Sequence, residues 1–218
     1  MPIIKYDSKL NYFVHIPKCG GSSVEDYLNQ IVGLQMAFLD REYLGRDKPW
    51  CNSSPQHVVA DQLDCLFPKL FFDGAFAVVR HPFSRFLSAF HHNKYLLKKN
   101  AIPEAQSVDS FIKEMLEPNY LREGWFDNHF FPQTGFIPNG ISYQFFRLED
   151  GLEDVKSHID NQIIGRSLAL EMPHSNKAAE VTGEMPRTTE LSHWAMEALM
   201  RLYAVDFLIF KYPMDQEV

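Results

Sequence analysis

Two stretches of the chain share one pattern: an apolar run, a turn of small or cationic residues, and then helical spacing. The first covers residues 12–23, Tyr-Phe-Val-His-Ile-Pro-Lys-Cys-Gly-Gly-Ser-Ser. The second covers residues 76–90, Phe-Ala-Val-Val-Arg-His-Pro-Phe-Ser-Arg-Phe-Leu-Ser-Ala-Phe. Short β-branched and aromatic runs are typical of buried strands, and apolar residues three or four apart are typical of helices. We therefore predict strands at 11–16 and 75–80, each followed by a helix, at 22–32 and 82–97.

The remaining pattern predicts more helices than strands. A third strand is expected at 141–147. Residues 40–56 are polar and are expected to form an exposed loop, whereas 118–140 are rich in aromatic residues, Pro and Gly and are expected to form a long loop over the site. Further helices are predicted at 58–67, 107–117, 152–159 and 188–205. Alternation of strands with helices predicts an α/β protein with a parallel sheet.

Both turns suit a bound phosphate. Small residues let backbone N–H groups approach anionic oxygens, and the helix N-terminus that follows adds its dipole. Ser22 or Ser23 is expected to open the first helix. Lys18 would act as a mobile cation, and Arg80 as a fork-shaped one. The first turn is not a Walker A loop, because Lys18 precedes its two glycines instead of following them.

The order HxPKxGGSS, joined to a later VRxPxxRxxSAF, resembles the sulfotransferases that use 3′-phosphoadenosine-5′-phosphosulfate (PAPS). The likeness is strongest to the carbohydrate sulfotransferases, including the heparan sulfate uronosyl 2-O type and bacterial relatives, and weaker matches extend it to residues 10–213. It implies one sulfotransferase domain, 1–218, with a three-layer fold like that of P-loop NTPases, in which helices flank a central parallel sheet.

The resemblance also implies roles for single residues. Those of the first motif would hold the 5′-phosphosulfate: Pro17, Lys18, Cys19, Gly20, Gly21, Ser22 and Ser23. Arg80 and Ser88 would hold the 3′-phosphate. Arg85 is left open between a ligand contact and a brace for the motif.

Sulfuryl transfer, like phosphoryl transfer, depends on positioning and on charge stabilisation at the departing oxygen. Lys18 is suited to stabilise the charge on that oxygen. The acceptor hydroxyl needs a titratable base, and His57 is the first candidate because several relatives place their base just before the second strand. His129, in the aromatic loop, is the second. His15 is expected to be structural, and His91 and His92 to be solvated.

Composition limits the partners. The 218 residues carry a net charge of −7, which argues against nucleic acid and favours a neutral or weakly charged hydroxylated acceptor, such as a glycan or glycolipid. No apolar run approaches the roughly 18 residues of a membrane span, so we expect a cytoplasmic protein, or a Golgi-lumenal one if an anchor precedes this sequence. The three cysteines form no metal or disulfide pattern. Cys19 fits as a small residue, although its thiol pKa could be lowered beside Lys18.

Two other functions use the same strand–loop–helix logic. A small-molecule kinase would need Mg²⁺, and the sequence offers no acidic strand end for it. A non-catalytic module would bind PAPS or its product PAP (3′-phosphoadenosine-5′-phosphate) without turnover. For a sulfotransferase we expect PAPS as co-substrate and no metal requirement.

Overall fold

The computed structural model describes residues 2–40, 42–43, 47, 50–68, 70–96, 102–117, 121–173 and 191–214. A five-stranded sheet in the order β3-β1-β2-β4-β5 forms its centre. The strands are β1 (Ile3–Tyr6), β2 (Lys9–Val14), β3 (Gln35–Ala37), β4 (Gly74–Val79) and β5 (Tyr143–Arg147). The helices are α1 (Gly21–Leu28), α2 (Ala60–Leu66), α3 (Pro82–His91), α4 (Val108–Met115), α5 (Glu153–His158), α7 (His193–Leu202) and α8 (Ala204–Ile209).

The sheet is mixed. Strands β2, β4 and β5 run parallel, as predicted, but β1 is antiparallel to both of its neighbours, β2 and β3. The expectation of a parallel sheet is therefore wrong at this edge. A two-residue hairpin turn joins β1 to β2, with Asp7 at a φ of 50°. Because the turn carries no glycine, the usual sequence signal for such a hairpin is missing.

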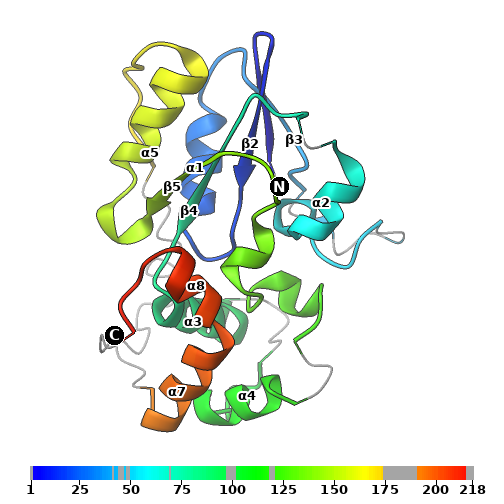
Figure 1. Ribbon diagram of the computed structural model, residues 1–218, viewed down its shortest axis with the longest axis vertical. Helices are drawn as coiled ribbons and strands as arrows, with labels where there is room; N and C mark the ends of the chain where they lie inside the picture. The colour runs from blue at the N-terminus through cyan, green and yellow to red at the C-terminus, as the bar shows by residue number, and fades with distance from the viewer. Residues whose placement is uncertain are drawn as a thin grey trace.

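Helices cover both faces of the sheet, as Figure 1 shows. On one face, Phe76 of β4 packs against His158 of α5, with ring centres 5.3 Å apart. On the other face, Tyr12 of β2 stacks on Phe72 at 5.3 Å, in the segment that follows α2. The prediction of an α/β protein with a helix-flanked sheet is confirmed.

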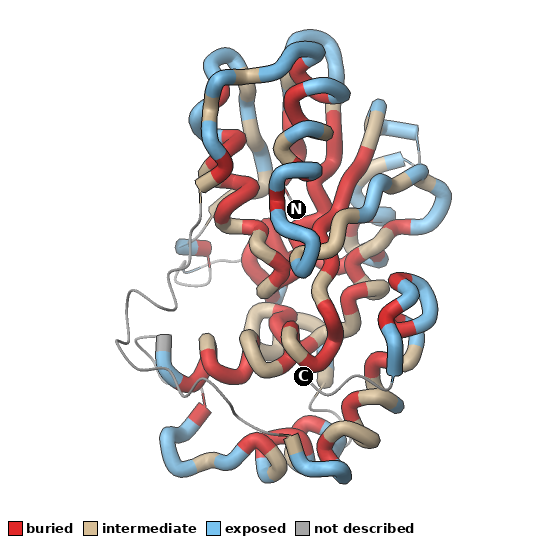
Figure 2. Tube along the Cα trace, turned by 90° about the vertical axis from the view of Figure 1, so that its left-hand side faces the viewer, coloured by how far each residue is buried: buried red, intermediate tan, exposed pale blue. Residues whose placement is uncertain are grey.

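The helices α3, α4, α7 and α8 gather beyond the carboxyl ends of β2 and β4 (Figure 1). Phe90 of α3 lies against Phe111 of α4, with ring centres 5.4 Å apart. Figure 2 shows long buried stretches of the chain, and these include most of β2, β4 and α3. The carboxyl ends of the strands therefore open towards a packed helical layer and not directly into solvent.

The helix predicted at 22–32 ends at Leu28, and two other predicted helices are each divided in the structure. α3 ends at His91 and continues as a π-helical turn, η3 (His92–Leu96). The helix expected at 188–205 is two helices, because α7 ends before Tyr203 and α8 begins after it. Ser192 caps the start of α7 by accepting a hydrogen bond from the Ala195 N–H. Residues 188–190 lie outside the described part of the chain.

Candidate active site

The loops that follow β2 and β4 lie side by side, because these strands are parallel neighbours in the sheet. Carboxyl ends of adjacent parallel strands meet at one edge, which is where α/β proteins usually bind ligands. Arg80 Nη1 donates a hydrogen bond to the carbonyl oxygen of Lys18, with an N···O distance of 3.3 Å. Cations from two separate motifs thus belong to one site.

The first loop changes direction through left-handed backbone. Lys18 has a φ of 68° and Gly20 a φ of 79°. For a lysine this conformation is strained, and such strain is typical of functional loops. α1 begins at Gly21 and its N-cap residue is Gly20, so the prediction that Ser22 or Ser23 opens the helix is wrong. Both serines lie inside its first turn.

Gly21 has no room for a side chain. A Cβ atom there would lie 2.1 Å from Nε2 of His15. His15 is buried, and its Nδ1 lies 2.5 Å from Oε1 of Glu25 in α1. Burial lowers the pKa of His15 by more than Glu25 raises it. His15 is thus fixed between the loop and α1, in agreement with the structural role expected for it.

The charges of the first loop are set mainly by burial. Burial, followed by the guanidinium of Arg80, lowers the pKa of Lys18 to about 8. Burial also raises the thiol pKa of Cys19 to about 12, although Arg85 and Arg80 act in the opposite direction. The alternative of a lowered Cys19 pKa is therefore wrong. The residue is a small, neutral part of the loop, with its sulfur 3.4 Å from Oε1 of Gln133.

The second loop is fixed through its backbone. The Gln133 side chain accepts from the Arg80 N–H at 3.0 Å and donates to the Arg80 carbonyl at 2.8 Å. Glu149 accepts from the next N–H, that of His81, at 2.7 Å. The backbone of Arg80 is thereby held, while its side chain stays partly exposed. Ser88 lies two turns into α3 and is partly buried, and the structure shows no hydrogen bond between Ser88 and Arg80, both of which it describes.

Arg85 is a brace. Its side chain is fully buried and donates to the carbonyl oxygens of His129, at 2.9 Å, and Phe131, at 2.6 Å. The guanidinium carbon also lies 5.5 Å from the ring centre of Tyr203. These contacts tie α3 to the segment that carries His129.

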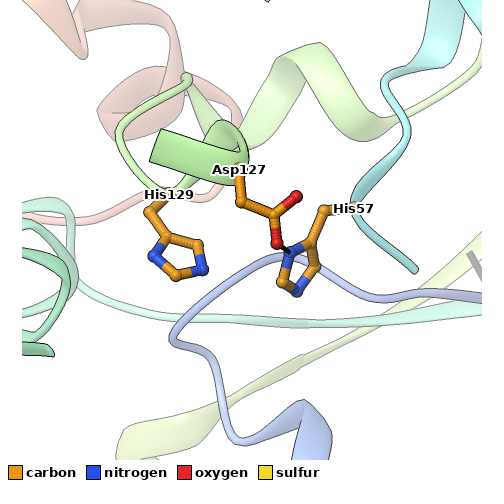
Figure 3. Close-up of side chains that lie close together, drawn as sticks. All are labelled: His57, Asp127 and His129. Atoms are coloured by element: carbon orange, nitrogen blue, oxygen red, sulfur yellow. Dashed lines mark hydrogen bonds and ion pairs between the residues drawn. The ribbon is translucent and has the colours of Figure 1, made fainter. Parts of the chain in front are cut away.

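His57 forms a hydrogen-bonded pair with Asp127, as Figure 3 shows. Nδ1 of His57 lies 2.7 Å from Oδ2 of Asp127, and both residues are largely buried. A carboxylate only accepts hydrogen bonds, so the proton of this contact sits on Nδ1. The neutral ring then has its lone pair on Nε2, to which no described residue hydrogen-bonds. Burial alone would raise the pKa of Asp127, but the charge that His57 carries when protonated and the hydrogen bond from it hold this pKa well below its usual range.

His129 lies close to the pair, but its Nδ1 accepts a hydrogen bond, whereas Nδ1 of His57 donates one. Asn93 donates from Nδ2 to the Ala89 carbonyl at 2.7 Å and to Nδ1 of His129 at 2.9 Å. The Ala89 contact fixes the orientation of the amide, so Nδ1 of His129 accepts and Nε2 carries the proton. Burial, followed by the charge of His57, holds the pKa of His129 well below its ordinary value. Of the two predicted bases, His57 is the one with an available lone pair.

His92 continues this row of imidazoles. Its ring centre lies 5.2 Å from that of His129, which lies 5.3 Å from that of His57. Burial, followed by the charge of Lys18, lowers the pKa of His92 to about 4. The expectation of solvated side chains is wrong for His91, which is buried, and holds only in part for His92, which is half-buried. The ring centre of His15, which precedes the first loop, lies 4.9 Å from that of His57, so the histidines and the first loop are neighbours.

A sequence model of the sulfotransferase family matches residues 3–213, almost the whole chain. The chain belongs to the sulfotransferase family. No curated protein and no solved structure matches it. The family supports an enzyme that transfers sulfuryl groups, as the two motifs predicted. Within the described residues of this sulfotransferase, no helix has the length and apolar character needed to cross a membrane.

His57, Asp127 and His129 also offer ligand atoms for a metal ion, all within 4.8 Å of one another. In the sulfotransferase as described, two of these three groups are joined by the 2.7 Å hydrogen bond. A metal ion that bound His57 through Nδ1 would replace the proton of that contact. The cluster can therefore hold either a proton or a metal ion between His57 and Asp127, but not both.

Sequence reasoning missed Asp127, Gln133 and the buried state of Ser54. The segment 127–133 was singled out only for His129, and residues 40–56 were expected to be exposed. Ser53 and Ser54 are in fact buried, and Ser54 donates to Asp127 from both its N–H and its hydroxyl, at 2.6 and 2.8 Å. The available signal was Asp127, an acid two residues before the candidate base His129. The sequence does not show that the Asp127 side chain points to His57, because this depends on the backbone geometry.

Proposed function

We propose that the protein transfers a sulfuryl group from PAPS to a hydroxyl of an acceptor by in-line displacement, with His57 as the general base. The observation that carries this proposal is the meeting of Lys18 and Arg80 at one sheet edge, in the same buried environment as the His57–Asp127 pair. Membership of the sulfotransferase family supports the reaction class.

The donor would lie across the two loops. The loop from Pro17 to Ser23 would hold the 5′-phosphosulfate through backbone N–H groups and the serine hydroxyls. Arg80 would hold the 3′-phosphate with Ser88, since a guanidinium can donate two parallel hydrogen bonds to a phosphate. The backbone contacts of Gln133 support this role, because they fix Arg80 without using its side chain.

In the reaction, the acceptor oxygen forms a bond to sulfur while the bond from sulfur to the 5′-phosphate oxygen breaks. The hydroxyl proton passes to Nε2 of His57, and negative charge builds up on the departing oxygen of PAP. Lys18 would stabilise that charge, which is larger in the transition state than in bound PAPS. His129, with its accepting Nδ1 already bonded to Asn93, is the second choice for the base.

The acceptor is proposed to be a carbohydrate or glycolipid without strong negative charge. The net charge of −7 supports this, because an acidic protein repels polyanionic glycans at long range. Labelled PAPS offered with neutral glycans, sulfated glycans, glycolipids and simple alcohols would identify the class. Transfer to heparan-type polyanions in preference to neutral sugars would contradict this part of the proposal.

Calorimetry tests the donor site. We expect PAP to bind in the presence of EDTA, and an analogue without the 3′-phosphate to bind more weakly. A kinase would instead bind ATP, and only with Mg²⁺. PAP binding without transfer to any acceptor class would favour a non-catalytic module, and the absence of PAP binding would refute the PAPS assignment.

A further inference from the structure

The backbone next to His57 takes a rare conformation. In the turn η4 (Trp125–Asn128), Phe126, Asp127 and Asn128 have φ angles of 47°, 55° and 60°. None of these three consecutive residues is glycine. Asp and Asn tolerate the left-handed region better than most residues, but Phe126 is disfavoured there, and a run of three is unusual. Such a run persists only where surrounding contacts enforce it, and it is concentrated at functional sites.

The contacts that enforce the turn connect it to His57. Oδ1 of Asn128 accepts from the Gly124 N–H at 2.7 Å, and its Nδ2 donates to the carbonyl oxygen of His57 at 2.9 Å. Asp127 accepts from Ser54, which lies just before the short helix η2 (Pro55–His57). The left-handed turn and the His57 segment are therefore held as one unit, although they are 70 residues apart.

Every hydrogen-bond donor around Asp127 favours its ionised form. The carboxylate accepts from the Ser54 N–H, from the Ser54 hydroxyl and from Nδ1 of His57. The strained turn thus presents a negative charge to one nitrogen of one imidazole. This arrangement selects the tautomer with the proton on Nδ1, and it stabilises the imidazolium that forms when Nε2 takes up a second proton.

We propose that Asp127 is a positioning residue for catalysis: it holds His57 in the Nδ1–H tautomer so that Nε2 can accept the proton of the acceptor hydroxyl. This proposal rests on the proposed function, in which His57 is the base. The other titratable groups facing His57 are His15, His129 and His92, with Lys18 beyond the last two. A positive charge on any of these groups would repel a protonated His57 ring. The negative charge of Asp127 attracts it and so acts in the opposite direction.

Asp127→Asn is the test. The Asn amide has nearly the same shape, but its NH₂ group facing His57 would donate to Nδ1 and so favour the Nε2–H tautomer. We expect nitrogen NMR of the ligand-free protein to show the Nδ1–H tautomer in the parent chain and loss of this tautomer in the variant.

Activity gives the second readout. In Asp127→Asn we expect kcat to fall roughly 10- to 100-fold, the usual effect of removing an orienting partner, with KM and PAP affinity within about twofold. Asp160→Asn is the matched control. Asp160 is also a buried acid, held by Tyr27, Lys156 and the Leu168 N–H, so its loss tests the general effect of removing such a group.

The outcomes separate this proposal from the proposed function. If the parent chain shows no sulfuryl transfer but the His57 tautomer changes in Asp127→Asn and not in Asp160→Asn, the proposed function fails and the positioning by Asp127 stands. If the tautomer and kcat are unchanged in Asp127→Asn, Asp127 is only structural. If Asp127→Asn does not fold, Ser54→Ala is the second variant, because it removes the hydroxyl that donates to the Asp127 carboxylate. A parent ring without a proton on Nδ1 would then overturn the proposal.

Discussion

The two halves of the site are built in opposite ways. The proposed donor half consists of two loops in which partly exposed cations lie just beyond strand ends, and each loop comes from one continuous segment. The base half consists of His57 and Asp127, which are 70 residues apart and connected by a dense set of hydrogen bonds. A flexible cation can follow charge as it moves along a ligand, whereas a base must keep one ring nitrogen in one protonation state.

The difference in charge between the halves is equally clear. In the donor half, Lys18 and Arg80 lie close together, and burial and this repulsion lower the pKa of Lys18. In the base half, the negative charge of Asp127 lies directly against His57. An anionic ligand would therefore supply the counter-charge that the proposed donor half lacks, while the base half already contains one.

The largest expected effect is that of His57→Ala. Loss of a general base usually lowers the rate by roughly 10²–10⁴, so we expect kcat to fall by this amount while PAP affinity stays within about twofold. The acidic limb of the pH–rate profile should also disappear, because it reports protonation of the base. Near-normal turnover with the limb retained would place the base elsewhere, and His129→Ala would be the next variant to measure.

Lys18→Ala should have an effect of the next size. Removing one group that stabilises the departing oxygen lowers kcat by roughly 10²–10³. PAP affinity should fall less than kcat does, because the charge on this oxygen is greatest in the transition state. Stopped-flow or steady-state rates at saturating PAPS give kcat, and calorimetry gives the affinity for PAP. A loss of PAP affinity with kcat unchanged at saturating PAPS would mean that Lys18 only binds the donor.

Arg80→Ala should affect the donor half alone. The lost charge-assisted contact corresponds to about 1.5–3 kcal/mol, or roughly a 10- to 100-fold weaker affinity for PAP. Affinity for an analogue that lacks the 3′-phosphate should barely change. If both ligands lose the same affinity, the effect of Arg80 is on the fold of the loop and not on the phosphate.

The smallest expected effect is a pH dependence of PAP binding. Because the pKa of Lys18 is lowered to about 8, this side chain is charged below that pH and loses its charge above it. An anionic ligand favours the charged form, so PAP affinity should fall as the pH rises above about 8, by up to about tenfold per unit. Calorimetry between about pH 7 and about pH 9.5 would measure the slope. In Lys18→Ala this slope should flatten, and a steep slope there would assign the effect to another group.

The positions of the two loops could be predicted from the sequence because each depends on a local pattern. Strands at 11–16 and 75–80 are close to the observed β2 and β4, and the loops that follow them carry Lys18 and Arg80 as expected. The exact start of α1 was missed, because Gly20 caps it through its left-handed backbone and not through a side chain. The hairpin of β1 and β2 was missed because its turn at Asp7 contains no glycine.

What the sequence by itself determined is the family, the α/β pattern and the two loops that carry Lys18 and Arg80, because the signals for each lie within short segments. Only the tertiary structure decided which histidine has an available lone pair. Asp127 reaches His57 through three left-handed residues, and Asn93 occupies Nδ1 of His129. A local pattern can indicate that an imidazole is present, but its protonation is set by donors and acceptors that arrive from distant parts of the chain.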